Sequence, residues 1–263
     1  SSSMRTHSAA GGCSGMTGDP HLGCQTRLGS KAFFNCSRLT FPDPLVLSNI
    51  TEVADQSFQG TRLARLDVRD APVETLYLSS CACLTNVIPL LPPTLTSVSL
   101  KSSGVRGDVR LSNPAMTAIG AYGMAMVNIS SIDLTGTSIA DDLGDRAFQN
   151  SEMMTNIVLS KVFAAFPNRF GVFYCARGIR WIHFRGDAPE TKANPFYNSG
   201  GQPTVCAAVV PRWNATWDDY FAAQEDCAVA ALTSSDVTTF RNNYPGEPVP
   251  LKKVKFGTGT AQT

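Results

Sequence analysis

The chain has 263 residues, of which 43% are hydrophobic and 16% are charged; this composition can bury a sizeable core and is not typical of disordered chains. The formal net charge is +1, from 22 basic and 21 acidic residues, so the chain lacks the excess of Lys and Arg that nucleic-acid-binding proteins use. No stretch approaches the roughly 20 apolar residues that a membrane-spanning helix needs. We therefore expect a folded protein with no nucleic-acid partner and no membrane span.

The first segment, residues 1–30, is rich in Ser and Gly and contains Cys13 and Cys24. We expect a flexible start that leads into an N-terminal cap, then a repeat region over 31–190 and a C-terminal capping region over 191–263. The beginning of the chain resembles a processed end, which fits an exported protein whose leader has been removed.

A six-residue pattern, apolar-x-x-apolar-x-apolar, recurs along the repeat region. Its clear copies begin at Leu63, Val73, Leu95, Ile129, Met154 and Ile179, and weaker copies begin at Leu84 and Met116. The starts at 73, 95 and 116 are 22 and 21 residues apart, and those at 154 and 179 are 25 apart. This period matches the roughly 20 to 29 residues of a leucine-rich repeat. Because alternate residues of a strand point to opposite faces, we expect the apolar positions of each copy to face a shared core.

A second element, Ala-Phe-x-x-Cys or a close variant, shares this period. Phe33 and Phe58 are 25 residues apart, and so are Phe148 and Phe173. One coil cannot cover its own apolar face, so two motifs with one period predict a solenoid in which each coil packs on the next. An ordinary β-sandwich is the alternative, but it explains only the hexads and not the spacing of the Phe residues.

The middle of the region, residues 101–128, lacks the Ala-Phe element and contains Gly104, Gly107, Gly120 and Gly123. We expect irregular coils there, and the sequence leaves their register open.

These motifs together resemble the BspA-type leucine-rich repeat over about residues 30–200. Ala32-Phe33 followed by Cys36 and Leu39 carries the resemblance, as do Ala147-Phe148 followed by Ile157 and Leu159. The segment from Phe184 to Pro189 is similar to the end of such arrays. The resemblance implies an exported or surface-attached protein that acts in adhesion and not in catalysis.

The C-terminal region departs from the repeat. Its sequence predicts a strand over 204–210, a helix over 214–225 with an apolar stripe of Trp217, Tyr220 and Phe221, and a second helix from Thr233 to Asn243. We expect these elements to cover the open end of the coils. The predicted fold class is therefore α/β or mainly β: a leucine-rich-repeat solenoid of short parallel strands with an α/β C-terminal cap.

Eight Cys residues occur without a C-x-x-C pair, and the three His residues are far apart in the sequence. We therefore expect no metal site and no cofactor. Cys36, Cys81 and Cys175 are predicted to be small buried residues in the coils. The candidate disulfides are Cys13–Cys24 and then Cys206–Cys227, although sequence alone does not settle the pairing.

Catalytic motifs are missing from the sequence. It contains neither the G-x-S-x-G elbow of hydrolases nor a phosphate-binding G-x-x-x-x-G-K loop. His183 is the one His within the repeats, and the acidic pairs Asp141-Asp142 and Asp218-Asp219 are sequence neighbours whose side chains do not converge. We therefore predict that the protein is not an enzyme.

The positions between the apolar residues of the hexads supply the candidate ligand-binding residues, because they are predicted to line the exposed face of the sheet. They include Arg65, Asp67, Tyr77, Asp133, Trp181, His183 and Arg185. Trp, Tyr and Arg are frequent anchors of interfaces, so Trp181, His183 and Arg185 form the preferred patch and Tyr77 is the second choice. The alternative for Trp181 is that it packs against the C-terminal region.

The predicted function is an exported binding or adhesion module, secreted or at the cell surface, that recognises a protein or a glycan through this face. The alternative is a structural spacer or a self-associating subunit of a surface layer.

Overall fold

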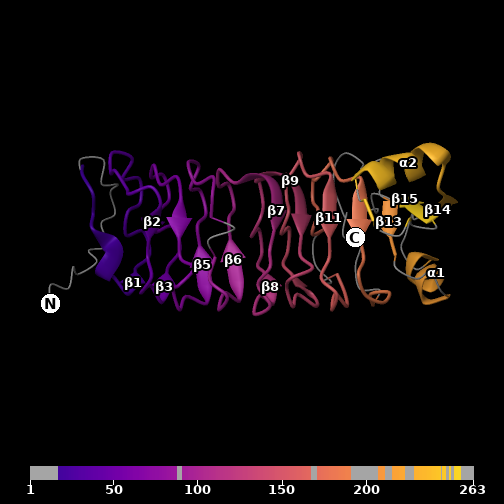
Figure 1. Ribbon diagram of the computed structural model, residues 1–263, viewed down its shortest axis with the longest axis horizontal. Helices are drawn as coiled ribbons and strands as arrows, with labels where there is room; N and C mark the ends of the chain where they lie inside the picture. Colours follow the sequence, from indigo (N-terminus) through magenta and orange to yellow (C-terminus); the bar gives the residue numbers. More distant parts are fainter. Residues whose placement is uncertain are drawn as a thin grey trace, which may run out of the picture.

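The computed structural model describes residues 17–87, 91–166, 171–190, 207–210, 215–222, 228–243, 245–246, 249 and 252–255. Most of this length winds into an elongated solenoid whose short strands pair in parallel from coil to coil (Figure 1). The expected solenoid of parallel strands with few helices is confirmed.

One side of the solenoid carries a six-stranded parallel sheet. Its strands, in spatial and chain order, are β1 (Arg27–Leu28), β3 (Glu52–Val53), β5 (Thr75–Tyr77), β6 (Ser97–Ser99), β8 (Ala118–Ile119) and β10 (Asp142–Leu143). Leu28, Val53, Leu76 and Val98 are consecutive partners across this sheet, and all four side chains are buried. This sheet is called the β1–β10 sheet below.

A second side of the coils carries two further parallel sheets. The first pairs β2 (Leu45–Val46) with β4 (Leu66–Asp67). The second has five strands in the order β13 (Ala207–Val209), β12 (Trp181–His183), β11 (Asn156–Val158), β9 (Asn128–Asp133) and β7 (Arg106–Arg110), and is called the β7–β13 sheet below. Figure 1 shows β2, β7, β9 and β11 in the upper half of the molecule and β1, β3, β5, β6 and β8 in the lower half.

Each coil therefore contributes a strand to both sides, which the hexads alone did not reveal. The copies that begin at Leu63 and Val73 lie in β4 and β5, which belong to different sheets of one coil. The prediction that all hexads line one exposed face is wrong. Both sheets turn their apolar residues toward the same interior, so both sides produce the same apolar pattern.

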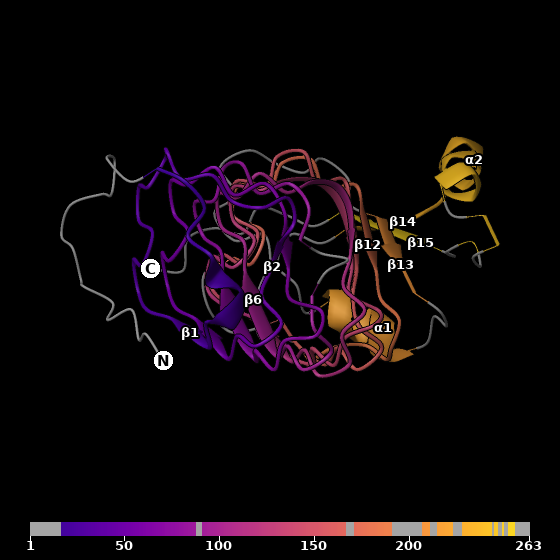
Figure 2. The ribbon, with the colours of Figure 1, turned by 60° about the vertical axis from the view of Figure 1, so that its left-hand side comes forward.

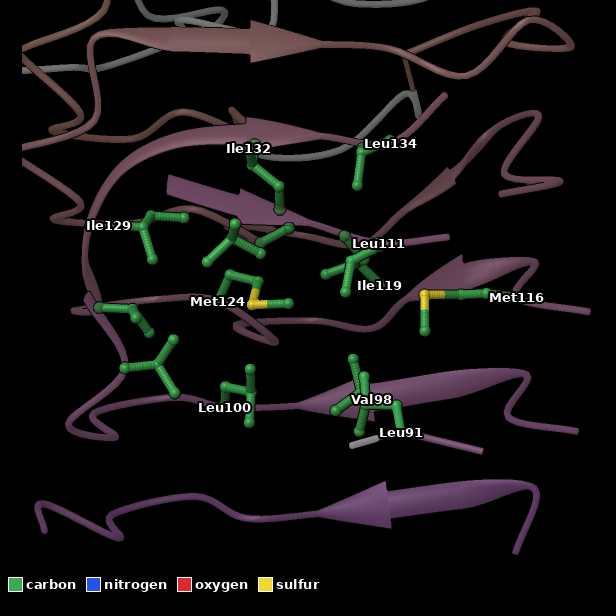
Figure 3. Packing of buried hydrophobic residues seen from close by; sticks show 14 of the residues in the cluster. Leu91, Val98, Leu100, Leu111, Met116, Ile119, Met124, Ile129, Ile132 and Leu134 are labelled. Carbon is green, nitrogen blue, oxygen red and sulfur yellow. The ribbon is translucent and has the colours of Figure 1, made fainter. Parts of the chain in front are cut away.

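The core runs along the axis between the two sides. Figure 3 shows side chains of successive coils meeting there, among them Val98, Ile119 and Ile132. The spacing of the Phe residues has its expected cause, because the rings stack between coils. The ring of Phe33 lies 5.8 Å from that of Phe58, and the ring of Phe148 lies 5.6 Å from that of Phe173, with interplanar angles of 18° and 21°.

The middle coils are more regular than the sequence suggested. The backbone N–H of Met124 donates to the carbonyl of Ala147, and that of Phe148 donates to the carbonyl of Val172. Met124 thus occupies in its coil the place that Phe148 has in the next. One irregularity remains, a register shift between Gly107 and Asp108 where β7 pairs with β9. Gly107 adopts a positive φ of 78° there, a conformation that glycine reaches at little cost.

Strand pairing extends beyond residues 31–190 at both ends. Gly18 forms a parallel bridge with Leu39, and a 3-10 helix at Leu22–Cys24 precedes β1. At the other end, β13 pairs with β12. Part of each predicted terminal segment therefore belongs to the solenoid itself.

The C-terminal region adds α1 (Ala215–Ala222), α2 (Ser234–Asn243) and the antiparallel pair β14 (Ala228–Ala231) and β15 (Lys252–Lys255). Both expected helices are present. Thr233 caps α2, because its hydroxyl accepts from the N–H of Asp236 at 3.2 Å and its own N–H donates to the Asp236 carboxylate at 2.7 Å. Trp217 and Tyr220 of α1 are buried against the end of the coils, where Phe184 contacts both rings.

The candidate disulfides each include a cysteine outside the described residues. Cys24 ends the 3-10 helix as an exposed free thiol. Cys13, the candidate partner of Cys24, and the pair Cys206 and Cys227 lie outside the described residues. Cys36 and Cys81 are buried in the coils as predicted, whereas Cys175 is half-buried.

Candidate binding surface

The preferred patch of the sequence analysis is covered in the structure. Trp181 is 9% exposed and His183 is fully buried. Phe240 of α2 lies over both residues, with its ring 5.6 Å from that of Trp181 and 6.0 Å from that of His183. Figure 2 shows α2 outside the ring of coils, next to the strands of the C-terminal region. The alternative for Trp181, packing against the C-terminal region, is therefore the arrangement found.

The other candidates on this side of the solenoid do not join that patch. Arg185 follows β12 and is half-buried. Asp133 shares a row of the sheet with His183, but the buried side chain of Val158 lies between them. The Asp133 carboxylate instead accepts from the Thr135 hydroxyl at 2.6 Å and lies 3.5 Å from Arg110.

Arg65 and Asp67 are held in local ion pairs at the other end of this side. The Arg65 guanidinium donates to Asp43 at 2.6 Å, and that of Arg69 donates to Asp67 at 2.8 Å. The hydrogen bond from Arg69 lowers the pKa of the Asp67 carboxyl below its ordinary value. These two candidates therefore bind neighbouring side chains and do not form one site with Asp133 or Trp181.

A polar cluster between β7 and β9 was not anticipated. The hydroxyls of Ser130 and Ser131 donate to the Asp108 carboxylate at 2.8 and 2.7 Å, and these bonds lower the pKa of Asp108. Asp108 follows the irregularity at Gly107, which is why spacing alone did not place it opposite these serines. Both hydroxyls bind the same carboxylate oxygen, so the cluster connects β9 to the bulged strand β7.

Tyr77 is the one candidate that stands clear of its surroundings. It lies on β5 in the β1–β10 sheet and is 42% exposed. Strand register places Ser99 of β6 beside Tyr77 on the following coil and Ala54 beside it on the preceding coil. Because both neighbouring side chains are small, the phenol ring of Tyr77 projects above the surface of the sheet.

A hollow of about 400 Å³ opens beside Tyr77, between β3 and β5. It is lined by Thr51, Glu52, Val53, Ala54, Asp55, Glu74, Thr75 and Tyr77. Glu52 accepts hydrogen bonds from the Arg27 guanidinium of the preceding coil. The Asp55 and Glu74 side chains are exposed. We call this hollow with Tyr77 the Tyr77 hollow.

The hexad pattern does not identify the acidic residues of the Tyr77 hollow. Glu52 lies outside every copy of the hexad, and Glu74 follows Val73 inside one copy but precedes the strand β5, so neither is among the candidate residues. The register Val53–Leu76 places Glu52 next to Thr75. A consistent 23-residue offset between these two coils would have brought these residues together.

Within the described ranges, no group of three His, Cys, Asp or Glu side chains is arranged to hold a metal ion. None of the helices in the described part of the chain is long and apolar enough to span a membrane. Comparison with protein-family models, with curated proteins and with solved structures finds no match to this chain.

Proposed function

We propose that the protein is a non-catalytic binding module that recognises a protein or glycan partner through the outer face of the β1–β10 sheet. The observation that carries this proposal is the exposed Tyr77 ring beside a hollow lined with carboxylates and hydroxyls. A tyrosine offers a large apolar surface and a polar tip at a small entropic cost, which suits it to an interface.

The neighbourhood of Tyr77 supports recognition by contact. The carboxylates of Glu52, Asp55 and Glu74 accept hydrogen bonds, and the Thr75 hydroxyl can both donate and accept them, whereas the Thr51 hydroxyl already donates to the Thr26 carbonyl at 2.8 Å. The opposite side offers less, because α2 covers Trp181 and His183 and the candidates Arg65 and Asp67 are already held in ion pairs. The resemblance to BspA-type repeats, with their role in adhesion, supports an exported protein that acts at the cell surface.

The test is binding of the intact protein to an array of peptides and glycans, with two variants for comparison. Thr75→Arg places a long side chain in the hollow. Asn128→Arg makes the same change of size and charge at an exposed position of β9, on the other side of the coils. The proposal predicts saturable binding to at least one class of probe, retained by Asn128→Arg and lost by Thr75→Arg.

Binding that survives in Thr75→Arg would exclude the hollow as the site. Failure of every probe to bind, together with concentration-dependent growth of the particle mass in light scattering, would favour the alternative of a self-associating spacer.

A further inference from the structure

The chemistry of the Tyr77 hollow points to a narrower class of partner than the proposed function, on which this inference rests. Ionised carboxylates only accept hydrogen bonds, and three of them line the hollow. The Thr51 hydroxyl already donates to the Thr26 carbonyl at 2.8 Å, so Thr75 and Tyr77 supply the remaining side-chain donors of the lining. A partner that fits this surface must therefore supply donors.

The charge at the hollow is only partly balanced by the protein. Arg27 neutralises Glu52, and side-chain ion pairs in the described part of the chain do not include Asp55 or Glu74. The formal net charge of the whole chain is +1, so the protein as a whole does not attract cations. The three carboxylates of the hollow and the one guanidinium of Arg27 leave a formal local charge of −2, so a complementary partner carries positive charge there.

Tyr77 can be compared with Tyr122, a second tyrosine of the same solenoid. The Lys101 ammonium lies 4.7 Å from the centre of the Tyr122 ring and the Arg146 guanidinium lies 6.0 Å from it. Arg146 also lies 4.8 Å from the centre of the Tyr174 ring. At Tyr122 the chain thus provides its own cations. The more exposed ring of Tyr77 has carboxylates around it instead, an arrangement suited to receiving a cation from another molecule.

The sheet beyond the hollow is level enough for an extended segment. The outward row that contains Tyr77 continues through Ser99 and then Gly120 on the two following coils, whereas Gly144 on the next coil is buried. These residues carry small side chains or none. A chain segment can therefore lie across the strands while one of its long side chains enters the hollow.

We propose that the Tyr77 hollow binds an arginine side chain from an extended segment of a protein partner, with the guanidinium over the Tyr77 ring and its N–H groups directed to Asp55 and Glu74. Arginine fits better than lysine, because its planar group stacks on an aromatic ring while its edge donates several hydrogen bonds. A glycan, which carries no positive charge, leaves Asp55 and Glu74 uncompensated.

The experiment is fluorescence anisotropy of the intact chain with three labelled probes: hexa-arginine, hexa-lysine and hexa-glutamate peptides. We expect hexa-arginine to bind more tightly than hexa-lysine and hexa-glutamate not to bind. Tyr77→Ser should weaken hexa-arginine binding about tenfold, whereas Tyr77→Phe should keep it within about twofold, because the ring face supplies the attraction.

Charge is tested by the double variant Asp55→Asn with Glu74→Gln, which should weaken hexa-arginine binding by at least about tenfold. The matched control is Asp141→Asn with Glu152→Gln, which removes the same charge from exposed positions on later coils and should leave binding within about twofold. Equal losses in the two double variants, or binding unaffected by Tyr77→Ser, would overturn the arginine site.

The outcomes separate this inference from the proposed function. If a glycan or an uncharged peptide binds and Thr75→Arg abolishes that binding while hexa-arginine does not bind, the arginine site is wrong and the binding function stands. If no probe of any class binds the wild-type protein, both fail.

Discussion

Replacement of Phe148 tests the stacked core that connects the coils. Phe148 is fully buried, its ring stacks on Phe173 at 5.6 Å, and its backbone pairs with the next coil. Removal of a buried Phe side chain costs about 3–5 kcal/mol, because the lost burial is joined by a cavity that the neighbours fill only in part. We expect Phe148→Ala to lower the free energy of unfolding by this amount in urea denaturation followed by circular dichroism.

Two further variants make this prediction specific. Phe33 stacks on Phe58 in the same way but is only half-buried in the first coils, so Phe33→Ala should cost about half as much. Phe148→Met should cost less than about 1.5 kcal/mol, because methionine adapts to core gaps and Met124 fills this place in the preceding coil. Two results would refute the view that these residues occupy equivalent, stacked positions in successive coils. One is an equal loss of stability for Phe148→Ala and Phe33→Ala, and the other is a Phe148→Met variant as unstable as Phe148→Ala.

Three other changes test different parts of the structure. A Cβ on Gly144 would lie 2.9 Å from the Cα of Ala121, whereas a Cβ on Gly120 would meet nothing within 4 Å. In urea denaturation, Gly144→Ala should therefore destabilise the fold by about 2 kcal/mol and Gly120→Ala by less than about 0.5 kcal/mol. Equal effects of the two substitutions would show that the coils do not approach closely at Gly144. Burial raises the pKa of the Cys81 thiol to about 12, so Cys81 should resist alkylation at mildly alkaline pH while exposed Cys83 reacts. Comparable labelling of both thiols, measured by mass spectrometry, would contradict the burial of Cys81 in the core. The lowered pKa of Asp67 implies that this carboxylate stabilises the fold above the ordinary carboxyl pKa, and that the stabilisation is lost as the pH falls through the pKa of the folded state. In Arg69→Gln, NMR of the carboxyl resonance should show the Asp67 pKa rising toward the ordinary value. An unchanged Asp67 pKa would exclude Arg69 as the cause of the shift.

The solenoid could be predicted from sequence because its core repeats at short range. Phe33 and Phe58 show the period directly, since each ring stacks on the equivalent ring one coil later. The assignment of faces could not be made in the same way. Val73 follows Leu63 by ten residues and Leu84 follows Val73 by eleven, each about half a repeat period, and these short spacings indicate that two strands belong to each coil.

The candidate surface was predictable only in part. Tyr77 was identified because a large aromatic residue at an outward strand position is conspicuous. Trp181 and His183 met the same criterion but are covered by Phe240, which lies 57 residues beyond His183 in the chain. Hexad patterns contain no information about such a distant contact. Asp55 and Glu74 depend on the register between two coils, which local pattern does not provide.

The most direct test of the binding surface is an NMR titration of the intact protein carrying isotope-labelled tyrosine rings, with hexa-arginine peptide as the ligand. The ring signals of Tyr77, assigned by their loss in Tyr77→Phe, should shift in a saturable way, while those of Tyr122 and Tyr174 stay in place because cations of the chain already contact them. Saturable shifts at Tyr122 or Tyr174 without a change at Tyr77 would contradict the assignment of the β1–β10 sheet as the binding surface.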